Sequence, residues 1–227
     1  MSGAASRLAV FDCDGTLVDS QGIVVAAMTA AFEAEGLRAP EARCIRQMVG
    51  LPLVEVVQRL APAGCNAVEL ADRYRDAYGD RFGLPEFQAP LFEGAVAALD
   101  ALERAGFLLG VATGKGRRGL IQVLDKHGLG ARFVTLQTAD DGPGKPNPLM
   151  LFNAMAEAGS APEATVMIGD TTFDVLMARN AGVAGIGVAW GYHDPAELVA
   201  AGADEIAGDF GTLPHIVERM MGARQCA

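Results

Sequence analysis

The second half of the chain alternates between short apolar runs and amphipathic segments, and this alternation constrains the fold most. Runs at residues 107–112, 133–136, 165–168 and 183–190 are short and bounded by turn residues, as buried strands are. Apolar residues at helical spacing follow the first three of these runs. Strands that alternate with helices form parallel sheets with helices on both faces. We therefore predict an α/β fold built on a parallel sheet.

Residues 20–85 have a different pattern, because no strand-like run interrupts them. Apolar residues recur there at helical spacing, beginning with Val24, Met28 and Phe32. Gly83 and Pro85 mark the return to the alternating region. We expect one domain from residues 1–19 and 86–227, with a small all-helical domain from residues 20–85 inserted after the first strand.

The composition excludes several classes of protein. The net charge of −10, with no basic stripe, argues against a nucleic-acid-binding surface. The apolar stretch at residues 181–190 is broken by glycine and too short to cross a bilayer, and the first residues lack the apolar core of a signal peptide. The four cysteines lack metal-binding spacing and are expected to be free thiols. We expect a cytoplasmic protein without nucleic-acid or membrane partners, either a monomer or a homodimer.

The first apolar run, residues 8–11, ends in Asp12 and Asp14. Gly15 then permits a sharp turn, so both carboxylates lie at the carboxyl end of a strand, where open α/β sheets bind ligands. A solvated Asp-Gly turn is the simpler interpretation and, for this stretch alone, is equally plausible. The alternative is a divalent-metal site with a carboxylate nucleophile.

Three later strand ends also bear distinctive residues. The first has Thr113, Gly114 and Lys115, the loop at residues 141–148 contains Lys145, and the last has Asp170 and Asp174. Separately, these segments are consistent with a turn, a rigid loop and a helix cap. In a parallel sheet all of these ends lie at one edge, so we predict that the side chains meet in one crevice.

Together, these residue types suit transfer of a phosphoryl group. Mg²⁺ prefers carboxylates and phosphate oxygens, which makes Asp12, Asp170 and Asp174 candidate ligands, Asp174 directly or through a water. Asp12 can attack phosphorus, and Lys145 can neutralise the charge that opposes this attack. The remaining roles are phosphate binding by Thr113 and Gly114 and general acid–base catalysis by Asp14.

These motifs resemble the four signature motifs of the haloacid dehalogenase superfamily. The matching residues are Asp12-x-Asp14-Gly15-Thr16-x-x-Asp19, Thr113, Lys145 in Gly-Lys-Pro-x-Pro, and Gly169-Asp170-x-x-x-Asp174. The resemblance implies a Rossmann-like core, Mg²⁺ as cofactor and an aspartyl-phosphate on Asp12. It also implies that the helical insertion is the superfamily's α-helical cap. The candidate metal ligands are then Asp12, Asp14, Asp170 and Asp174.

Within the superfamily, the sequence is most similar to the phosphoglycolate phosphatase-like branch. The residues after Phe11, the Gly50-Leu51-Pro52 loop and Trp190-Gly191-Tyr192 resemble that branch. Asp14 argues against a dehalogenase or a phosphonatase, which have other residues there. One departure is Gly114, where Asn is commoner; it removes a side chain that could contact the substrate.

The function predicted from the sequence is Mg²⁺-dependent hydrolysis of a small phosphorylated metabolite, such as phosphoglycolate or a sugar phosphate. Gly114, Lys115, Gly50 and Arg46 are candidate substrate-binding residues, although a solvated surface arginine is the favoured interpretation of Arg46. A β-phosphoglucomutase-like phosphotransferase on the same core is an alternative. A catalytically silent binding protein is a third hypothesis, and the intact set of acidic and basic residues argues against it.

Overall fold

The computed structural model describes residues 6–225, which contain a six-stranded parallel sheet with strand order β3-β2-β1-β4-β5-β6. The strands are β1 (Arg7–Phe11), β2 (Phe107–Ala112), β3 (Phe133–Gln137), β4 (Thr165–Gly169), β5 (Ala184–Val188) and β6 (Glu205–Ala207). This architecture confirms the predicted α/β class and the Rossmann-like core. The shortest strand, β6, lies at the edge of the sheet.

Helices cover both faces of the sheet. Successive residues of each strand point to opposite faces, and the strands are apolar on both, so each face needs a covering layer. Leu8 and Val10 pack with α7 (Leu149–Ala158) and α8 (Thr172–Ala181) on one face. Ala9 and Phe11 belong to the larger apolar core on the other face. Among the helices that contribute to that core are α5 (Ala95–Arg104), α6 (Arg117–Lys126) and α10 (Leu213–Gln225). A short helix, α9 (Pro195–Ala201), packs against β5 and β6.

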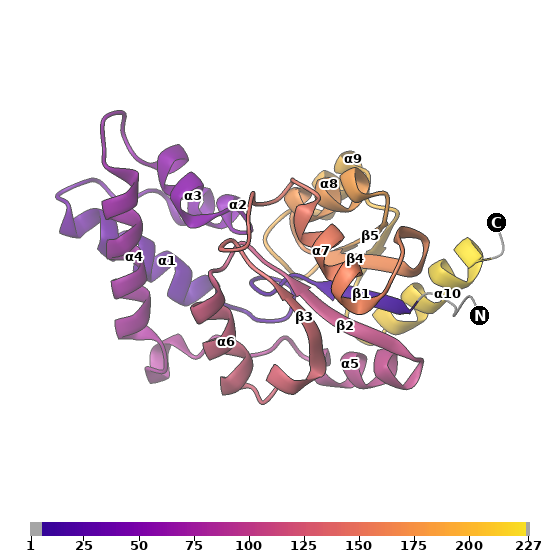
Figure 1. The fold of residues 1–227 in the computed structure, drawn as a ribbon. Coiled ribbons are helices and arrows are strands. Elements are labelled where there is room, and N and C mark those ends of the chain that lie inside the picture. Colours follow the sequence, from indigo (N-terminus) through magenta and orange to yellow (C-terminus); the bar gives the residue numbers. More distant parts are fainter. Residues whose placement is uncertain (1–5, 226–227) are drawn as a thin grey trace.

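Between β1 and the sheet's second strand, the chain forms four further helices, which we call the helical insertion. They are α1 (Gln21–Ala34), α2 (Ala42–Met48), α3 (Leu53–Leu60) and α4 (Ala67–Arg81). The longest two, α1 and α4, pack against each other, and the group lies beside the sheet (Figure 1). A single 3-10 turn, Pro85–Phe87, follows the insertion before α5.

The sheet reverses its direction of winding at β1, which has β2 on one side and β4 on the other. Open α/β sheets bind ligands at such a switch point, beyond the carboxyl ends of the strands. Pairing continues past the strand itself, because the Asp12 amide donates to the Ile168 carbonyl oxygen at 2.9 Å. Asp12 and Asp170 are therefore held side by side. No helix among residues 6–225 has the length and apolar character needed to cross a membrane.

Candidate active site

Lys145 joins two of the predicted acidic residues at the sheet edge. Its Nζ lies 3.0 Å from Asp12 Oδ1 and 2.6 Å from Asp174 Oδ1, and all three side chains are at most 1% exposed. Burial opposes a charged ammonium, but Asp12 and Asp174 raise the pKa of Lys145 above its ordinary value. Lys145 is therefore a fixed cation beside Asp12, which is the contact that the sequence predicted.

Asp170 reaches the same place from the end of β4 and is held by two other loops. Its Oδ1 accepts a hydrogen bond from Thr16 Oγ1 at 2.8 Å, and its Oδ2 accepts one from the Tyr192 amide at 2.9 Å. Glycine at position 191 is required for this approach, since a Cβ there would lie 2.1 Å from Asp170 Cβ. The loop after β5 thus orients a carboxylate at the end of β4.

Asp12, Asp170 and Asp174 form a cluster that suits a divalent cation. Each offers a carboxylate oxygen, and these oxygens lie within 4.8 Å of one another. The second oxygen of Asp12, Oδ2, has no hydrogen-bond partner among the described residues. Buried carboxylates that lack partners are costly unless a cation or a proton compensates them. A hard, oxygen-seeking ion such as Mg²⁺ fits this donor set.

The pKa values of these carboxyl groups give the same indication. Burial, together with the nearby charge of Asp174, raises the pKa of Asp12 to about 7 despite the opposing effect of Lys145. Burial and the charges of Asp12 and Asp174 raise the pKa of Asp170 well above its ordinary value. The cluster therefore carries more negative charge than Lys145 neutralises, and a bound cation would relieve the excess.

Asp174 has a structural role beside its place in the cluster. Its Oδ2 accepts hydrogen bonds from the Thr171 amide and hydroxyl at 3.0 and 2.7 Å. The Asp174 amide donates in return to Thr171 Oγ1 at 3.4 Å, which completes a capping box at the start of α8. The helix-cap interpretation considered for Asp170 thus applies to Thr171 and Asp174 instead. With Oδ1 on Lys145, both oxygens of Asp174 are engaged, which suits a residue that positions the lysine.

Asp14 lies outside this acidic cluster and pairs with a different lysine. Its Oδ2 is 3.1 Å from Lys115 Nζ, and its Oδ1 has no hydrogen-bond partner among the described side chains and backbone. Lys115 also contacts Tyr78 of α4, with Nζ 3.3 Å from the hydroxyl and 4.6 Å from the ring centre. The structure thus places Asp14 with Lys115 rather than with the other candidate metal ligands, and connects the sheet edge to the helical insertion.

Thr113 and Gly114 lie at the end of β2, next to the insertion. The Thr113 amide donates to the Gln137 carbonyl oxygen at 3.0 Å, and its hydroxyl accepts from the Lys115 amide at 3.2 Å. A Cβ on Gly114 would lie 2.5 Å from the Gly50 carbonyl oxygen. The absence of a side chain at Gly114 therefore lets the Gly50-Leu51-Pro52 loop approach closely, a consequence that the sequence did not reveal.

A second glycine makes room for the same loop. A Cβ on Gly144 would lie 2.2 Å from Pro52 Cγ, so Pro52 packs directly on the backbone beside Lys145. Gly50 itself has a φ of +102°, a conformation that disfavours other residues. The two glycines, Gly114 and Gly144, form a shallow seat for the loop, which we call the glycine seat.

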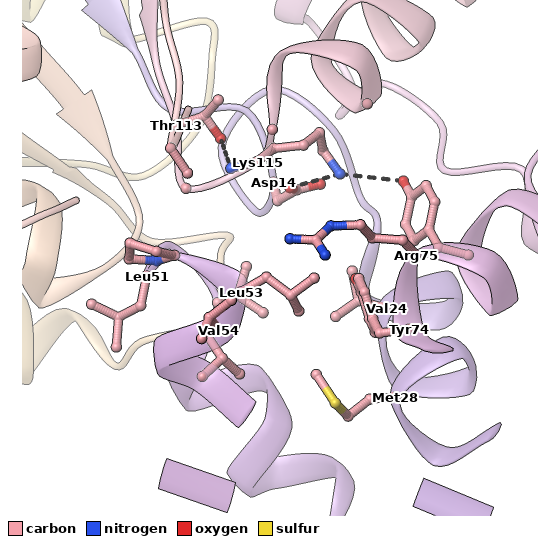
Figure 2. Close-up of a pocket in the computed structure, with 18 of the residues that line it drawn as sticks. Asp14, Val24, Met28, Leu51, Leu53, Val54, Tyr74, Arg75, Thr113 and Lys115 are labelled. Carbon is pink, nitrogen blue, oxygen red and sulfur yellow. Dashed lines mark hydrogen bonds and ion pairs between the residues drawn. The ribbon is translucent and has the colours of Figure 1, made fainter. Parts of the chain in front are cut away.

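The sheet edge and the insertion enclose a cavity of about 930 Å³. Asp12, Asp14, Thr113 and Lys115 line one part of it. Residues of α1 to α4, of α6 and of the loop after β3 line the rest, and Figure 2 shows several of these side chains. Arg75 of α4 extends into this space, and Arg118 of α6 also lines it. The predicted residue Gly50 lines the cavity as expected.

Arg46 is not among the residues that line this cavity, although the sequence suggested it as a substrate contact. Only Ile45 of its helix, α2, lines the cavity, because the side chains of consecutive helical residues point in different directions. None of the residues of α4 that line the cavity, among them Arg75 and Tyr78, was proposed from the sequence. The sequence feature that could have indicated these cavity residues is the pair Tyr74 and Tyr78, which are four residues apart and therefore lie on one face of α4.

Trp190 and His193 support the loops around the site. The Trp190 Nε1–H donates to the Thr16 carbonyl oxygen at 3.0 Å, and its ring packs on Phe210 with centroids 4.5 Å apart. His193 Nδ1 accepts from the Thr172 amide at 3.2 Å, and Nε2 donates to the Gln47 carbonyl oxygen at 3.1 Å. Cys13, whose pKa burial raises well above its ordinary value, is enclosed in the core.

The family model of the haloacid dehalogenase-like hydrolases matches residues 9–188 of this sequence. This range includes every residue of the site described above, apart from Phe210 and the residues of the loop after β5. The chain belongs to this family. It is 36% identical over 209 residues to a probable phosphatase, IndB, of Dickeya dadantii, with 91% of each chain covered. A phosphoglycolate phosphatase of Agrobacterium fabrum is 30% identical over 224 residues, covering 95% of this chain and 94% of that protein.

Solved structures of the family have the same fold. A hydrolase from Pseudomonas syringae superposes with a TM-score of 0.82 at 27% identity, covering 94% of this chain and 99% of that one. The predicted family and its phosphoglycolate phosphatase-like branch are therefore confirmed.

Proposed function

We propose that this protein is a Mg²⁺-dependent phosphatase that cleaves a small phosphorylated metabolite through an aspartyl-phosphate on Asp12. The observation that carries the proposal is the unpartnered Asp12 Oδ2 beside the buried Lys145 ammonium. A buried carboxylate oxygen without a hydrogen-bond partner is free to act as a nucleophile. The phosphatases among its relatives support the reaction class.

Asp12 and Asp170 would hold the cation, with Asp174 nearby. When bound, Mg²⁺ supplies positive charge that offsets the charge of the phosphoryl group and orients it. Lys145 adds a second positive charge at Asp12 Oδ1, so the nucleophile and an anionic substrate are less strongly repelled.

Asp12 Oδ2 then attacks phosphorus, and the bond from phosphorus to the ester oxygen breaks. Thr113 and the Gly114 amide, at the end of β2, would bind the phosphoryl oxygens during this step. Asp14 would deliver a proton to the departing alcohol through its unpartnered Oδ1. In the second step Asp14 takes a proton from water, the water oxygen bonds to phosphorus, and Asp12 is released with inorganic phosphate.

The helical insertion would act as the cap, with residues 20–85 as the cap domain and residues 1–19 and 86–227 as the core. In this arrangement the Lys115–Tyr78 contact and the glycine seat hold the cap against the core. Closure of this kind excludes bulk water from the phosphoryl group until the product forms. The cap, rather than Arg46 alone, would then determine which alcohol is accepted.

Replacement of Asp12 by Asn tests the proposal. Asp12→Asn should abolish phosphate release from phosphorylated metabolites and from an aryl phosphate, because the amide is a poor nucleophile, while the melting temperature shows that the fold persists. Asp125→Asn, an exposed position far along the chain in α6, is the matched control and should retain activity. Normal turnover by Asp12→Asn would refute the nucleophile assignment.

Acid quenching of the active enzyme during turnover gives a second readout. Digestion should yield a phosphorylated peptide that contains Asp12, and omission of Mg²⁺ should remove it. Formation of an isomerised sugar phosphate in place of inorganic phosphate would favour the mutase alternative.

A further inference from the structure

The cavity is larger than the smallest substrates of such an enzyme require. Its volume of about 930 Å³ lies at the upper end of the range of roughly 300–1,000 Å³ typical of pockets for drug-sized ligands. Phosphoglycolate and pyrophosphate have only a few atoms beyond the phosphoryl group. Either would leave most of this space filled with water.

Away from the phosphoryl-binding residues, the cavity lining combines apolar side chains with the charged residues Arg75, Asp76 and Asp80 of α4. We call Val24, Met28, Leu51, Leu53 and Val54 the apolar wall; they come from α1, α3 and the loop before α3. Figure 2 shows Val24, Met28, Leu53 and Val54 on the side away from Thr113 and Lys115. A charged or strongly hydrated organic group would lose water against such a surface without gaining hydrogen bonds.

We propose that the preferred substrates are phosphomonoesters of bulky, largely apolar alcohols, whose organic body lies against the apolar wall. This inference rests on the proposed function, because the phosphoryl group must lie at Asp12 for the body to reach the wall. Burial of an apolar body against these side chains supplies the binding free energy that a glycolate cannot. The half-exposed Arg75 extends into the cavity. A polar group at the far end of the substrate would remain hydrated beside it.

Gly79 gives a way to fill this space without disturbing the backbone. It lies one turn after Arg75 on α4, and both residues line the cavity. A Cβ at Gly79 would meet no heavy atom within 4 Å, and its φ is not in the left-handed region. A leucine side chain at position 79 would therefore begin without a clash and add bulk to the part of α4 that lines the cavity.

Gly22 is the matched control, because it too is a helical glycine of the insertion at which a Cβ would meet no heavy atom within 4 Å. It lies in the first turn of α1 and does not line this cavity. Gly→Leu improves helix propensity at both positions, so any effect on folding should be similar.

The test measures kcat/KM of the unaltered enzyme with Mg²⁺ for ethyl, butyl, hexyl and 3-phenylpropyl phosphate, and for phosphoglycolate. The four alcohols are similar leaving groups, so differences report binding of the body. We expect kcat/KM to rise roughly two- to fourfold for each methylene that reaches the wall, so hexyl phosphate should exceed ethyl phosphate at least tenfold. Equal values, or a preference for phosphoglycolate, would overturn the inference.

The variants sharpen the same test. Gly79→Leu should lower kcat/KM for hexyl and 3-phenylpropyl phosphate at least fivefold and change that for ethyl phosphate less than twofold, whereas Gly22→Leu should alter neither. An equal fall for short and long esters would also overturn the inference. By contrast, no phosphate release from any ester, or release that persists in Asp12→Asn, would refute the proposed function itself.

Discussion

The two sides of the cavity are built on opposite principles. At the sheet edge, buried charged groups contact one another at fixed distances, as Lys145 does with Asp12 and Asp174. The apolar wall of the insertion, which includes Met28 and Leu53, is instead held by apolar packing. Charged networks are sensitive to the loss of any one member, whereas apolar walls tolerate substitutions of similar volume. For the proposed function, this contrast implies that the site of phosphoryl transfer is rigidly specified, whereas the site for the organic part of the substrate tolerates change.

Lys145→Met gives the strongest test of the charged side. Methionine keeps much of the volume but leaves Asp12 and Asp174 without their cation. We expect kcat to fall on the order of 10²–10³-fold, the usual cost of losing one electrostatic donor, and stability to fall by about 3–5 kcal/mol. Kinetics and chemical denaturation measure the two effects, and Met28→Leu on the apolar wall is the contrasting control, with less than about 1.5 kcal/mol lost.

The stability of the metal-free protein should depend on pH through Asp12. Its pKa rises from 3.8 in the unfolded chain to about 7 in the fold, chiefly through burial, so the folded state binds more protons between these values. Stability from this group is full below about pH 4 and is lost as the pH rises to about 7, by about 4 kcal/mol at most.

Thermal unfolding with a chelator, and then with Mg²⁺, measures this dependence. The gain in melting temperature on adding Mg²⁺ should be larger at pH 8 than at pH 5, because protons no longer compete for the carboxylates. Asp12→Asn should flatten the pH dependence of the chelated protein. Equal gains at both pH values would contradict the cation site proposed for this cluster.

Gly114→Ala probes the contact between the two sides. The added Cβ would lie 2.5 Å from the Gly50 carbonyl oxygen, so the Gly50-Leu51-Pro52 loop must move away from its seat. We expect kcat/KM to fall on the order of 10- to 100-fold, as displacements of about 1 Å near reacting groups do, with little change in melting temperature. Gly208→Ala, where a Cβ meets no atom within 4 Å, is the matched control. Unchanged kinetics in Gly114→Ala would show that the seat is unimportant for turnover.

The smallest expected effect comes from removing Arg75, and we compare it with the removal of Arg46, another arginine of the insertion. Arg75 extends into the cavity, whereas Arg46 does not line it. Arg75→Ala should raise KM roughly 2- to 10-fold for substrates with a polar tip, the equivalent of about one hydrogen bond, and leave kcat nearly unchanged. Steady-state kinetics of Arg46→Ala should match the unaltered enzyme. The reverse result would restore Arg46 as the substrate contact suggested by its position before the Gly50 loop.

The sequence predicted the charged side well because parallel strands impose its geometry. Asp12, Lys145 and Asp170 follow strand ends, and all such ends lie at one edge of a parallel sheet. The alternation of strands and helices was therefore enough to predict that these side chains lie close together. The apolar side was not predictable in this way. Whether Arg46 or Arg75 faces the cavity depends on how α2 and α4 are rotated about their axes, which tertiary packing decides.

The pairing of lysines with carboxylates was also only partly predictable. Lys115 belongs to the same strand-end segment as Thr113, yet its partners are Asp14 and Tyr78, and the second comes from the insertion. Similarly, the sequence grouped Asp174 with Asp170 as a candidate metal ligand, but its capping of α8 depends on Thr171. Local spacing indicates the direction of a side chain, whereas its partner depends on the neighbouring loop.

The position of the chain's single tryptophan makes the protein suited to label-free spectroscopy. Trp190 bonds to the loop after β1 through the Thr16 carbonyl oxygen, while Thr16 and Tyr192 both hold Asp170. Any rearrangement of these loops alters the indole's hydrogen bond or its packing on Phe210. Its emission wavelength and lifetime therefore report directly on events at the sheet edge, on the timescale of rapid mixing and against no background from a second indole.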